Sequence, residues 1–367
     1  MASSFAIRAC SLVLLSLSRA APSPTQELPT TGRELYQIGC AKCHGADGRG
    51  VDLETVGVDL PLPDLSDCRF TTRETDADWM AVAHSGGPAR GFSDTMPAFG
   101  EAFAEEQLQK IIDFIRSFCT KPWPRGELNF PKALVTEKAY PEDELIGTTS
   151  IAAEGAGSVE GELLYERRLG ALNQIELKLP LAVREAGSSG SWRAGVGDVA
   201  AGIKRALYHS LERGAIGSAG VEVVFPTGDE ADGFGKGTLV FEPFLAFGKT
   251  LSRSGFFQLQ AGAELPVDSE VAEPEAFWRL VLGGTLTQGR WGRSWSPMVE
   301  ILGTAGLDGG TVDWEILPQV QLSLSARQHV FVNAGVRIPL TSTESRSTRL
   351  VFYFLWDWFD GGLLEGW

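Results

Sequence analysis

The most constraining feature of this sequence is a regular alternation of apolar with polar or small residues through the second half of the chain. In residues 173–184, Ile175 and Leu177 fall on one face of an extended chain, whereas Glu176 and Lys178 fall on the other. The same pattern recurs in residues 256–267, 319–326 and 329–340. Strands of globular proteins average ~5 to 6 residues, whereas these runs approach the ~9 to 11 that a strand needs to cross a membrane. The pattern therefore predicts long antiparallel strands with one apolar side.

These strands are expected to close into a barrel. We find no apolar run of ~18 residues after the N-terminal segment, so a closed barrel is the form in which the chain could cross a bilayer. Aromatic residues near the ends of the runs are typical of membrane interfaces, and they include Trp192, Tyr208, Trp278, Trp291, Trp295 and Trp314. About eleven candidate runs can be distinguished, and closed bacterial barrels use even strand numbers, so we predict about 12 strands, with about 10 as the alternative. A soluble β-sandwich is the other fold that the alternation allows.

A short motif near the N-terminus points to a specific chemistry. Residues 39–45 read GCAKCHG, which has the spacing C-x-x-C-H. Two thiols at this spacing can add to the two vinyl groups of a porphyrin, which places the adjacent imidazole beneath the iron. A zinc ribbon would need a second cysteine pair or paired histidines, and a thioredoxin-like site would need a βαβ context. The motif predicts one covalently bound haem c, with Cys40 and Cys43 as thioether cysteines and His44 as the proximal iron ligand.

The second axial ligand of the iron should come from the same region, and Met96 is the preferred candidate. It lies in the segment TMPAFG, where proline and glycine favour an irregular loop. His84 is the alternative ligand, although residues 76–85 read as a short helix in which Met80 is expected to be a core residue. A thioether ligand stabilises ferrous iron relative to a second imidazole, so ligation by His44 and Met96 implies the higher-potential kind of haem centre.

The surrounding elements resemble those of a class I cytochrome c. Residues 32–39 (GRELYQIG) predict an opening helix, and residues 105–118 (EEQLQKIIDFIRSF) predict a closing helix with apolar residues at helical spacing. The resemblance covers residues 30–120. It implies an all-α monohaem domain in which the first and last helices cross, and it gives the thioether, proximal and distal roles to the residues named above.

The N-terminal segment and the remaining cysteines indicate that the protein is exported from the cytoplasm. Residues 1–21 read as a secretory signal peptide, with the apolar stretch SLVLLSL followed by small residues, and its removal would also remove Cys10. Cys68 and Cys119 lie outside the haem motif. In an exported protein a disulfide between them is the natural expectation, and two free buried thiols are the alternative.

The two halves are expected to be separate domains. Residues 121–158 form a polar segment marked by prolines and predict a linker, and residues 159–367 predict the barrel. The phrases VEVVFPTG at 221–228 and FEPFLAFGK at 241–249 resemble an outer-membrane β-barrel family associated with the meta-pathway of phenol degradation, whose members are regarded as transporters. The plan of a cytochrome joined to a barrel is also similar to that of the fused cytochrome-porins of iron-oxidising bacteria. The expected fold is therefore multidomain, with an N-terminal all-α class I cytochrome c domain followed by an antiparallel transmembrane β-barrel.

The charge balance limits the partners. With 32 basic and 47 acidic residues, the formal net charge is −15, which argues against a nucleic acid and favours a basic redox partner. We expect outer-membrane electron transfer through a haem coupled to a porin-like barrel. The haem domain would lie in the periplasm or at the pore mouth, with a periplasmic redox protein such as another cytochrome as partner and outer-membrane lipid around the barrel.

Two alternative functions remain open at this point. The barrel could be a transporter for small hydrophobic or aromatic compounds with an attached periplasmic cytochrome, or it could simply anchor a periplasmic electron carrier. An enzyme is not expected, because an iron with two protein ligands has no open coordination position. A role as accessory to an oxidoreductase is the nearest enzymatic alternative.

Overall fold

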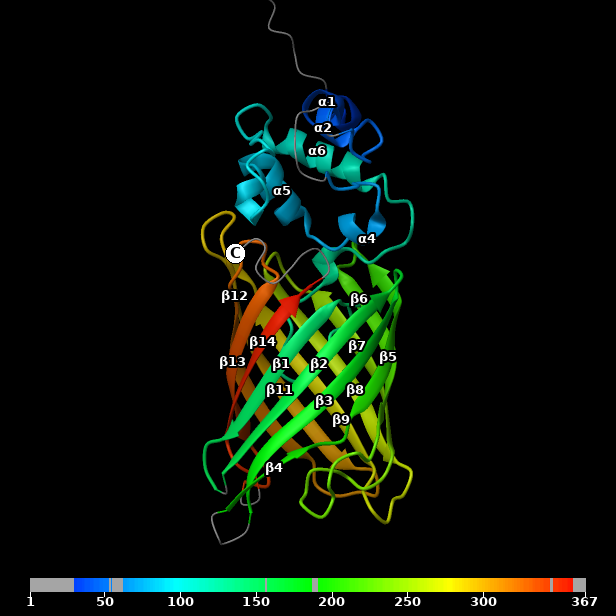
Figure 1. Cartoon of the computed structure of the whole chain (residues 1–367), viewed down its shortest axis with the longest axis vertical. Helices are drawn as coiled ribbons and strands as arrows, with labels where there is room; N and C mark the ends of the chain where they lie inside the picture. The colour runs from blue at the N-terminus through cyan, green and yellow to red at the C-terminus, as the bar shows by residue number, and fades with distance from the viewer. Residues whose placement is uncertain are drawn as a thin grey trace, which may run out of the picture.

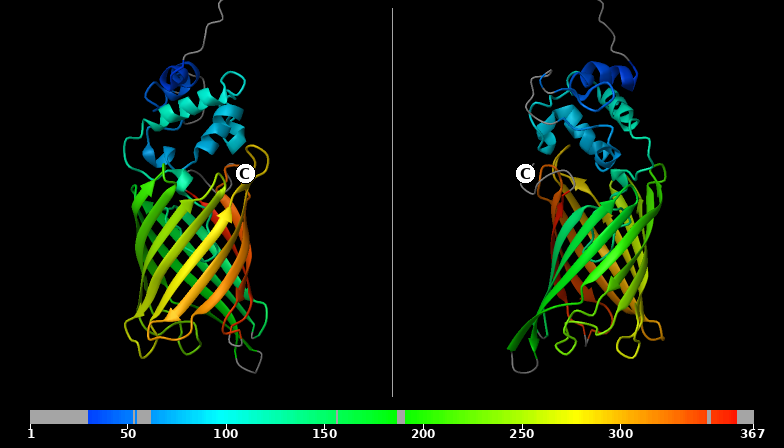
Figure 2. Two further views of the ribbon diagram at one scale, coloured as in Figure 1. Left: turned by 180° about the vertical axis from the view of Figure 1, so that it is seen from behind. Right: turned by 45° about the vertical axis from the view of Figure 1, so that its right-hand side comes forward.

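The computed structural model describes residues 30–52, 54, 62–155, 157–186, 191–343 and 346–358. A helical domain stands on one end of a β-barrel whose strands run obliquely to its long axis (Figure 1). The views from behind and from the side also place the helical domain outside the barrel (Figure 2). The predicted signal peptide, residues 1–21, falls outside the described residues. Among the described residues, no helix has the length and apolar character needed to cross a membrane.

The helical domain is made of short helices joined by loops. They are α1 (Gly32–Gly39), α2 (Ala41–His44), α4 (Cys68–Thr71), α5 (Asp76–Ser85), the 3-10 helix η1 (Gly87–Arg90) and α6 (Glu105–Arg116). Helix α1 packs against α6, and a Cβ atom at Gly32 would lie 2.0 Å from the carbonyl oxygen of Lys110. The two helices can approach this closely because residue 32 has no side chain. The predicted pair of packed helices is therefore present, although α6 ends at Arg116 rather than at residue 118.

The barrel is one antiparallel sheet that closes on itself. Its strands are β1 (Glu144–Ala152), β2 (Ser158–Leu169), β3 (Asn173–Ala186), β4 (Ser191–Val196), β5 (Ala200–Ser210), β6 (Ala215–Val224), β7 (Val240–Thr250), β8 (Gly255–Pro266), β9 (Glu275–Gly284), β10 (Leu286–Thr287), β11 (Ser294–Gly306), β12 (Asp313–Ser323), β13 (Val330–Pro339) and β14 (Arg349–Asp357). Closure is made by β1 and β14, with Glu144 opposite Asp357. Strands β4 and β5 pair with successive halves of β3, so together they count as one strand of the barrel wall. Strands β9 and β10 likewise pair with successive parts of β11 and count as one strand. The barrel thus has 12 strand positions, which confirms the prediction.

The predicted boundary between linker and barrel is wrong. Strand β1 lies wholly within residues 121–158, and it pairs with β2 and β14 along its length. Its sequence, ELIGTTSIA, carries Thr and Ser at inward positions and Gly at an outward one, so the contrast between its two faces is weak. Pairing with two neighbouring strands, rather than its own pattern, makes this segment a strand.

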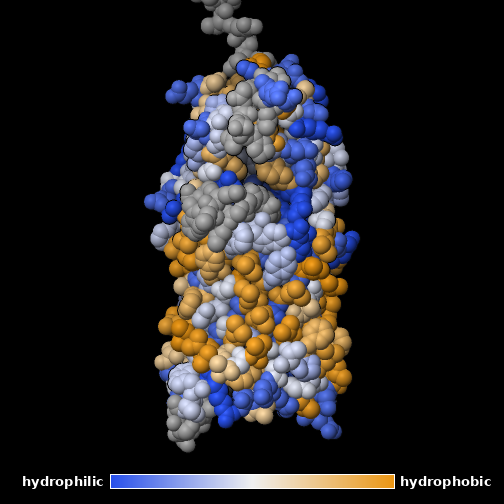
Figure 3. Space-filling model, viewed as in Figure 1, coloured by the Kyte–Doolittle hydropathy of each residue, from blue (hydrophilic) through white to orange (hydrophobic). Residues whose placement is uncertain are grey.

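The outer surface of the barrel is apolar and its lumen holds many polar side chains, whereas a soluble sandwich has a polar surface. On β3, Leu177 and Leu179 are exposed, whereas Gln174 and Glu176 are buried in the lumen. Hydrophobic residues cover the middle of the barrel surface, and hydrophilic residues gather at the helical domain and at the opposite end (Figure 3). A closed barrel with an apolar outer band is the architecture of an outer-membrane protein. The expected membrane location follows from the fold itself.

The lumen contains a segment that we call the plug, residues 129–143. It has no regular strand, and its backbone groups bond to side chains of the barrel wall. The Leu134 N–H donates to Gln319 Oε1 at 3.0 Å, and the Glu137 N–H donates to Gln260 Oε1 at 2.9 Å. Buried backbone groups need such partners because water cannot reach them. Most of the predicted linker is therefore part of the barrel's core.

Candidate functional site

The C-x-x-C-H motif lies at the junction of α1 and α2. The Cys40 N–H donates to the Tyr36 carbonyl at 2.8 Å, which ends α1, and the His44 N–H donates to the Cys40 carbonyl at 2.9 Å. The Tyr36 hydroxyl donates to the Gly45 carbonyl at 2.7 Å, so the end of α2 is tied back to α1. Cys40 and Cys43 are three residues apart on this turn and neither is in a disulfide. Local hydrogen bonding thus holds the two thiols and the imidazole together.

The protonation states fit covalent attachment of a haem. Burial, together with a smaller contribution from the nearby Cys43, raises the pKa of the Cys40 thiol to about 12. Burial lowers the pKa of His44, which keeps the imidazole neutral near pH 7. A neutral imidazole is the form that binds iron, and thioether formation requires that the two thiols be free, as Cys40 and Cys43 are. The donor set therefore suits the predicted chemistry.

Two unsatisfied polar atoms in the helical domain also fit a bound group. His44 Nδ1 and Trp79 Nε1 are buried without a hydrogen-bond partner among the described residues. Such atoms are uncommon in folded proteins, and a group bound in this region would account for them. Partly buried apolar side chains, including Phe70 and Phe99, pack against the hydrophobic core of the helical domain. The residues present fit a haem.

The loop that carries the predicted distal ligand, residues 91–100, is held against α5; we call it the Met96 loop. The Gly87 N–H donates to the Met96 carbonyl at 3.0 Å, and the Phe99 N–H donates to the Ala83 carbonyl at 3.0 Å. Met96 itself is partly buried. Its ligation of iron stays a prediction.

The alternative ligands differ in their surroundings. Met80 is buried in the core of the helical domain, as expected for a core methionine. The His84 ring lies directly over Gly100, where a Cβ atom would come within 2.6 Å of it. Its Nδ1 atom lies 3.1 Å from Ser85 Oγ, and its ring centroid is 6.0 Å from that of Trp291. His84 is thus packed between the Met96 loop and a residue of the barrel.

Cys68 and Cys119 form a disulfide, with their Cα atoms 5.1 Å apart. The bond joins α4 to the chain just after α6, at a sequence separation of 51 residues. Helix α4 leads into the residues that meet the barrel, so the disulfide ties that surface to the closing helix of the domain.

One contact between the helical domain and the barrel is built on buried ion pairs. Arg73 contacts Asp143 at the end of the plug, and both side chains are almost completely buried. Glu74 Oε1 lies 2.8 Å from His329 Nε2, in the turn between β12 and β13. The Gly126 N–H donates to the Thr72 carbonyl at 2.7 Å. These contacts fix the base of the helical domain to the barrel mouth.

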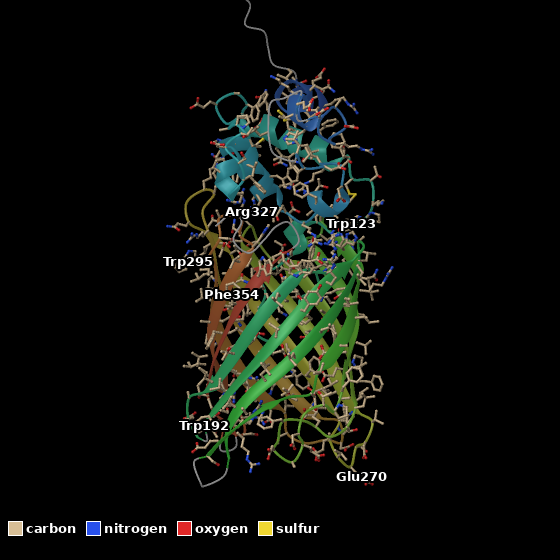
Figure 4. The ribbon with its side chains drawn as sticks, in the orientation of Figure 1. Trp123, Trp192, Glu270, Trp295, Arg327 and Phe354 are labelled. Carbon is tan, nitrogen blue, oxygen red and sulfur yellow. A yellow bond between two sulfur atoms is a disulfide. The ribbon has the colours of Figure 1, made fainter. Side chains whose placement is uncertain are left out.

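A second contact involves barrel turns that sequence reasoning did not connect with the haem domain. Trp291, expected among the aromatic residues of the membrane interface, instead packs against the core of the helical domain. Its carbonyl accepts a hydrogen bond from Arg90 Nη1 at 2.5 Å. Trp192 and Trp295 do lie on the exposed barrel surface, toward opposite ends (Figure 4). The position of Trp291 could not be found from its spacing, because it depends on a domain far away in the sequence.

The plug carries charges that are paired inside the lumen. Lys132 Nζ lies 2.8 Å from Glu137 Oε2, and Lys138 Nζ lies 2.5 Å from Glu142 Oε1 and 2.7 Å from Glu144 Oε1. Such pairs inside a protein are stable only when their geometry and hydrogen bonds compensate for desolvation. The lumen therefore holds a specific polar core rather than an open channel at this level.

Comparisons with known proteins agree with the division into two parts. Residues 27–115 match the model of a family described as cytochrome c oxidase, cbb3-type, subunit III. No curated protein matches the sequence at a significant level.

Solved structures to which this chain is similar include several porins and channels. One is an outer membrane channel from Pseudomonas putida F1, with 15% identity and a TM-score of 0.42 over 62% of this chain and 98% of that chain. Others are the KdgM porin, with 11% identity and a TM-score of 0.36 over 58% and 98% of the two chains, and the NanC porin, with 7% identity and a TM-score of 0.39 over 58% and 97%.

The protein therefore joins a c-type cytochrome domain, at residues 27–115, to a closed 12-stranded outer-membrane β-barrel, and the family of the first domain implies a covalently bound haem c.

Proposed function

We propose that this protein is a single-haem electron carrier anchored in the outer membrane, which exchanges electrons with a redox protein on the periplasmic side. The proposal rests on which of the two ends of the barrel the cytochrome domain adjoins. Three turns at the end beside this domain, 170–172, 211–214 and 251–254, have three or four residues, and two more, 288–293 and 324–329, have six. Longer loops, 225–239 and 267–274, lie at the other end. Bacterial outer-membrane barrels have short periplasmic turns and longer external loops.

The residues of the chain support a carrier rather than a catalyst. When bound, a haem supplies one-electron redox chemistry. Cys40 and Cys43 would attach it, and His44 and Met96 would bind its iron. With two side chains bound to the iron, a substrate would have no site there. The surrounding apolar side chains would exclude water and favour a high reduction potential.

The plug bears on what the barrel does. It occupies the lumen beneath the cytochrome domain and is bonded to the wall from several strands. This weighs against a route in which an external donor passes through the pore to the haem. The luminal groups that meet the plug include amides and carboxylates, and Phe130 of the plug also stacks on Phe256 of the wall, with the ring centroids 5.5 Å apart. The plug thus fills apolar as well as polar space in the lumen, which weighs against passage of small hydrophobic or aromatic compounds. Anchoring is the role that this arrangement favours.

The test is reduction of the haem from one side of a membrane. Full-length, haem-loaded protein is placed in sealed liposomes that also enclose a soluble cytochrome, and a membrane-impermeant reductant is added outside. Protease accessibility measures independently the fraction of cytochrome domains that face outward. We expect the reduced fraction of bound haem to equal that outward fraction and the enclosed cytochrome to stay oxidised. Retention of an enclosed self-quenched dye reports independently that the vesicles are tight.

Complete reduction of the bound haem in vesicles that stay tight would contradict the anchor and would establish a conduit across the barrel. If the haem absorbance did not change even after detergent gave the reductant access to every haem, the carrier function itself would be contradicted.

The expected positive net charge of the partner protein can be tested. The chain's net charge of −15 should attract a basic soluble cytochrome more strongly than an acidic one. We expect the rate of electron exchange with the basic partner to fall as ionic strength rises, because salt screens the attraction. Equal rates with both partners at low salt would rule out electrostatic docking.

A further inference from the structure

We propose that two turns of the barrel, residues 288–293 and 324–329, position the Met96 loop and thereby set how firmly Met96 binds the haem iron. The inference rests on the proposed function for its assignment of Met96 as the distal ligand. It adds that the barrel tunes the redox centre in addition to anchoring it.

The inner side of the Met96 loop is held by the cytochrome domain, but its outer side is held by the barrel. Arg327, in the turn between β12 and β13, donates from Nη2 to the Gly91 carbonyl at 3.3 Å. The Arg327 guanidinium also lies over the Phe92 ring, 4.6 Å from its centroid. Figure 4 places Arg327 at the barrel mouth, just below the helical domain. One barrel side chain therefore contacts two successive residues of the loop.

The second turn contacts residues that adjoin the loop. Trp291 packs beside His84, and the backbone N–H of Gly100 in the Met96 loop donates to the His84 carbonyl at 2.9 Å. The Trp291 carbonyl accepts from Arg90, the residue directly before the loop. Arg90 in turn donates from Nε to Asp78 Oδ1 at 2.7 Å. Trp291 thus contacts the two residues that adjoin the ends of the Met96 loop: Arg90, which directly precedes it, and His84, which bonds to Gly100.

The ion pair between Arg90 and Asp78 contacts both turns. Arg90 is 5% exposed, and its partner Asp78 also accepts a long hydrogen bond of 3.4 Å from Gln328, beside Arg327. A pair buried in this way holds α5, η1 and both barrel turns in one arrangement. Loosening either turn should therefore increase the freedom of the loop.

A loosely held loop matters because a thioether is a weak ligand of ferric iron. Loops open locally with free energies far below that of global unfolding, and contacts that hold the closed form reduce the open population. An open Met96 loop would expose the sixth position of the iron to other ligands, and it would remove the preference for ferrous iron that a thioether provides. The barrel contacts would therefore raise both the reduction potential and the resistance to external ligands.

The experiment compares variants of the full-length protein in detergent. Arg327→Ala and Trp291→Ala remove the two barrel contacts, and Arg327→Lys keeps the positive charge near Phe92. The matched control is Arg213→Ala, an exposed arginine in a turn at the same end of the barrel with no side-chain contact described to the cytochrome domain. The readouts are the weak charge-transfer band of thioether-ligated ferric haem, the reduction potential, and the affinity of added imidazole for the ferric iron.

We expect Arg327→Ala and Trp291→Ala to weaken the band, lower the potential, and tighten imidazole binding by about tenfold. Arg327→Lys should recover part of the change, and Arg213→Ala should match the wild type. Wild-type values in both alanine variants would overturn the inference. A wild-type protein without the band, or a Met96→Ala variant that keeps it, would instead overturn the assignment of Met96, and the inference would fall with it.

Discussion

Arg73 of the cytochrome domain and Asp143 at the end of the plug form an ion pair whose side chains are 4% and 0% exposed. Asp143 also accepts the backbone N–H of Arg168 on β2 at 2.9 Å. One carboxylate thus joins the cytochrome domain, the plug and the barrel wall. The docking of the two domains is part of the buried core and not a loose surface contact.

Removing one member of this pair should strongly destabilise the docked state. We expect Arg73→Ala to cost about 3 kcal/mol, because it removes the nearest cation of the buried Asp143 carboxylate and leaves Arg167 and Arg69, whose nitrogens lie 3.7 and 3.9 Å away. The double variant Arg73→Ala, Asp143→Ala should lose less than the sum of the single variants. Thermal unfolding of the full chain provides the measurement. The exposed pair Arg193 and Asp232 is the control and should contribute about 1 kcal/mol or less.

The attachment of haem should depend on the two motif thiols. We expect the double variant Cys40→Ser, Cys43→Ser to lose haem staining on a denaturing gel, because no covalent bond to the porphyrin can form. Cys119→Ser should retain the stain, since that residue is bonded to Cys68 and lies outside the motif. Haem that stays with the double variant under denaturing conditions would contradict thioether attachment.

The disulfide should stabilise the cytochrome domain. The Cys68→Ser, Cys119→Ser variant is expected to lose about 2 to 4 kcal/mol of unfolding free energy, since the bond closes a long loop in the unfolded chain. Denaturant titration followed by haem absorbance would measure it. In the unreduced wild type, mass spectrometry after alkylation should find neither cysteine modified; two modified cysteines would show that the bond is absent.

The plug should close the barrel to ions. Glu300, on β11, accepts from the Val135 N–H at 3.1 Å, the Thr136 N–H at 2.8 Å and the Thr136 hydroxyl at 2.5 Å. Glu300→Ala would leave these plug groups unsatisfied, each at a cost of about 1 to 3 kcal/mol. We expect low conductance for the wild type in planar bilayers and frequent openings for this variant.

The control for the plug experiment is Glu222→Ala. Glu222 is also buried in the lumen, but it pairs with Lys178 of the wall rather than with the plug. It should leave the closed state unchanged. Equal conductance in the wild type and Glu300→Ala would mean that Glu300 does not hold the plug in place.

Local patterns in the sequence were sufficient for the haem motif and for most of the barrel. The C-x-x-C-H spacing determines which atoms are close together, because one helical turn brings residues three and four apart side by side. The alternation in β3 determines which of its residues face lipid, because successive side chains of a strand point to opposite sides. Both relationships hold within a single segment, so no distant residue is needed to establish them.

The plug, the strand β1 and the position of Trp291 were decided by the tertiary structure alone. The plug has no periodicity, and its backbone is stabilised by Gln260, Glu300 and Gln319, which follow it by more than a hundred residues. Strand β1 has a weak pattern and becomes a strand because β2 and β14 supply hydrogen bonds on both edges. Trp291 lies against the cytochrome domain because barrel closure and docking bring its turn there. In each case the stabilising partner is distant in sequence, so the free energy that selects the structure appears only when the whole chain has folded.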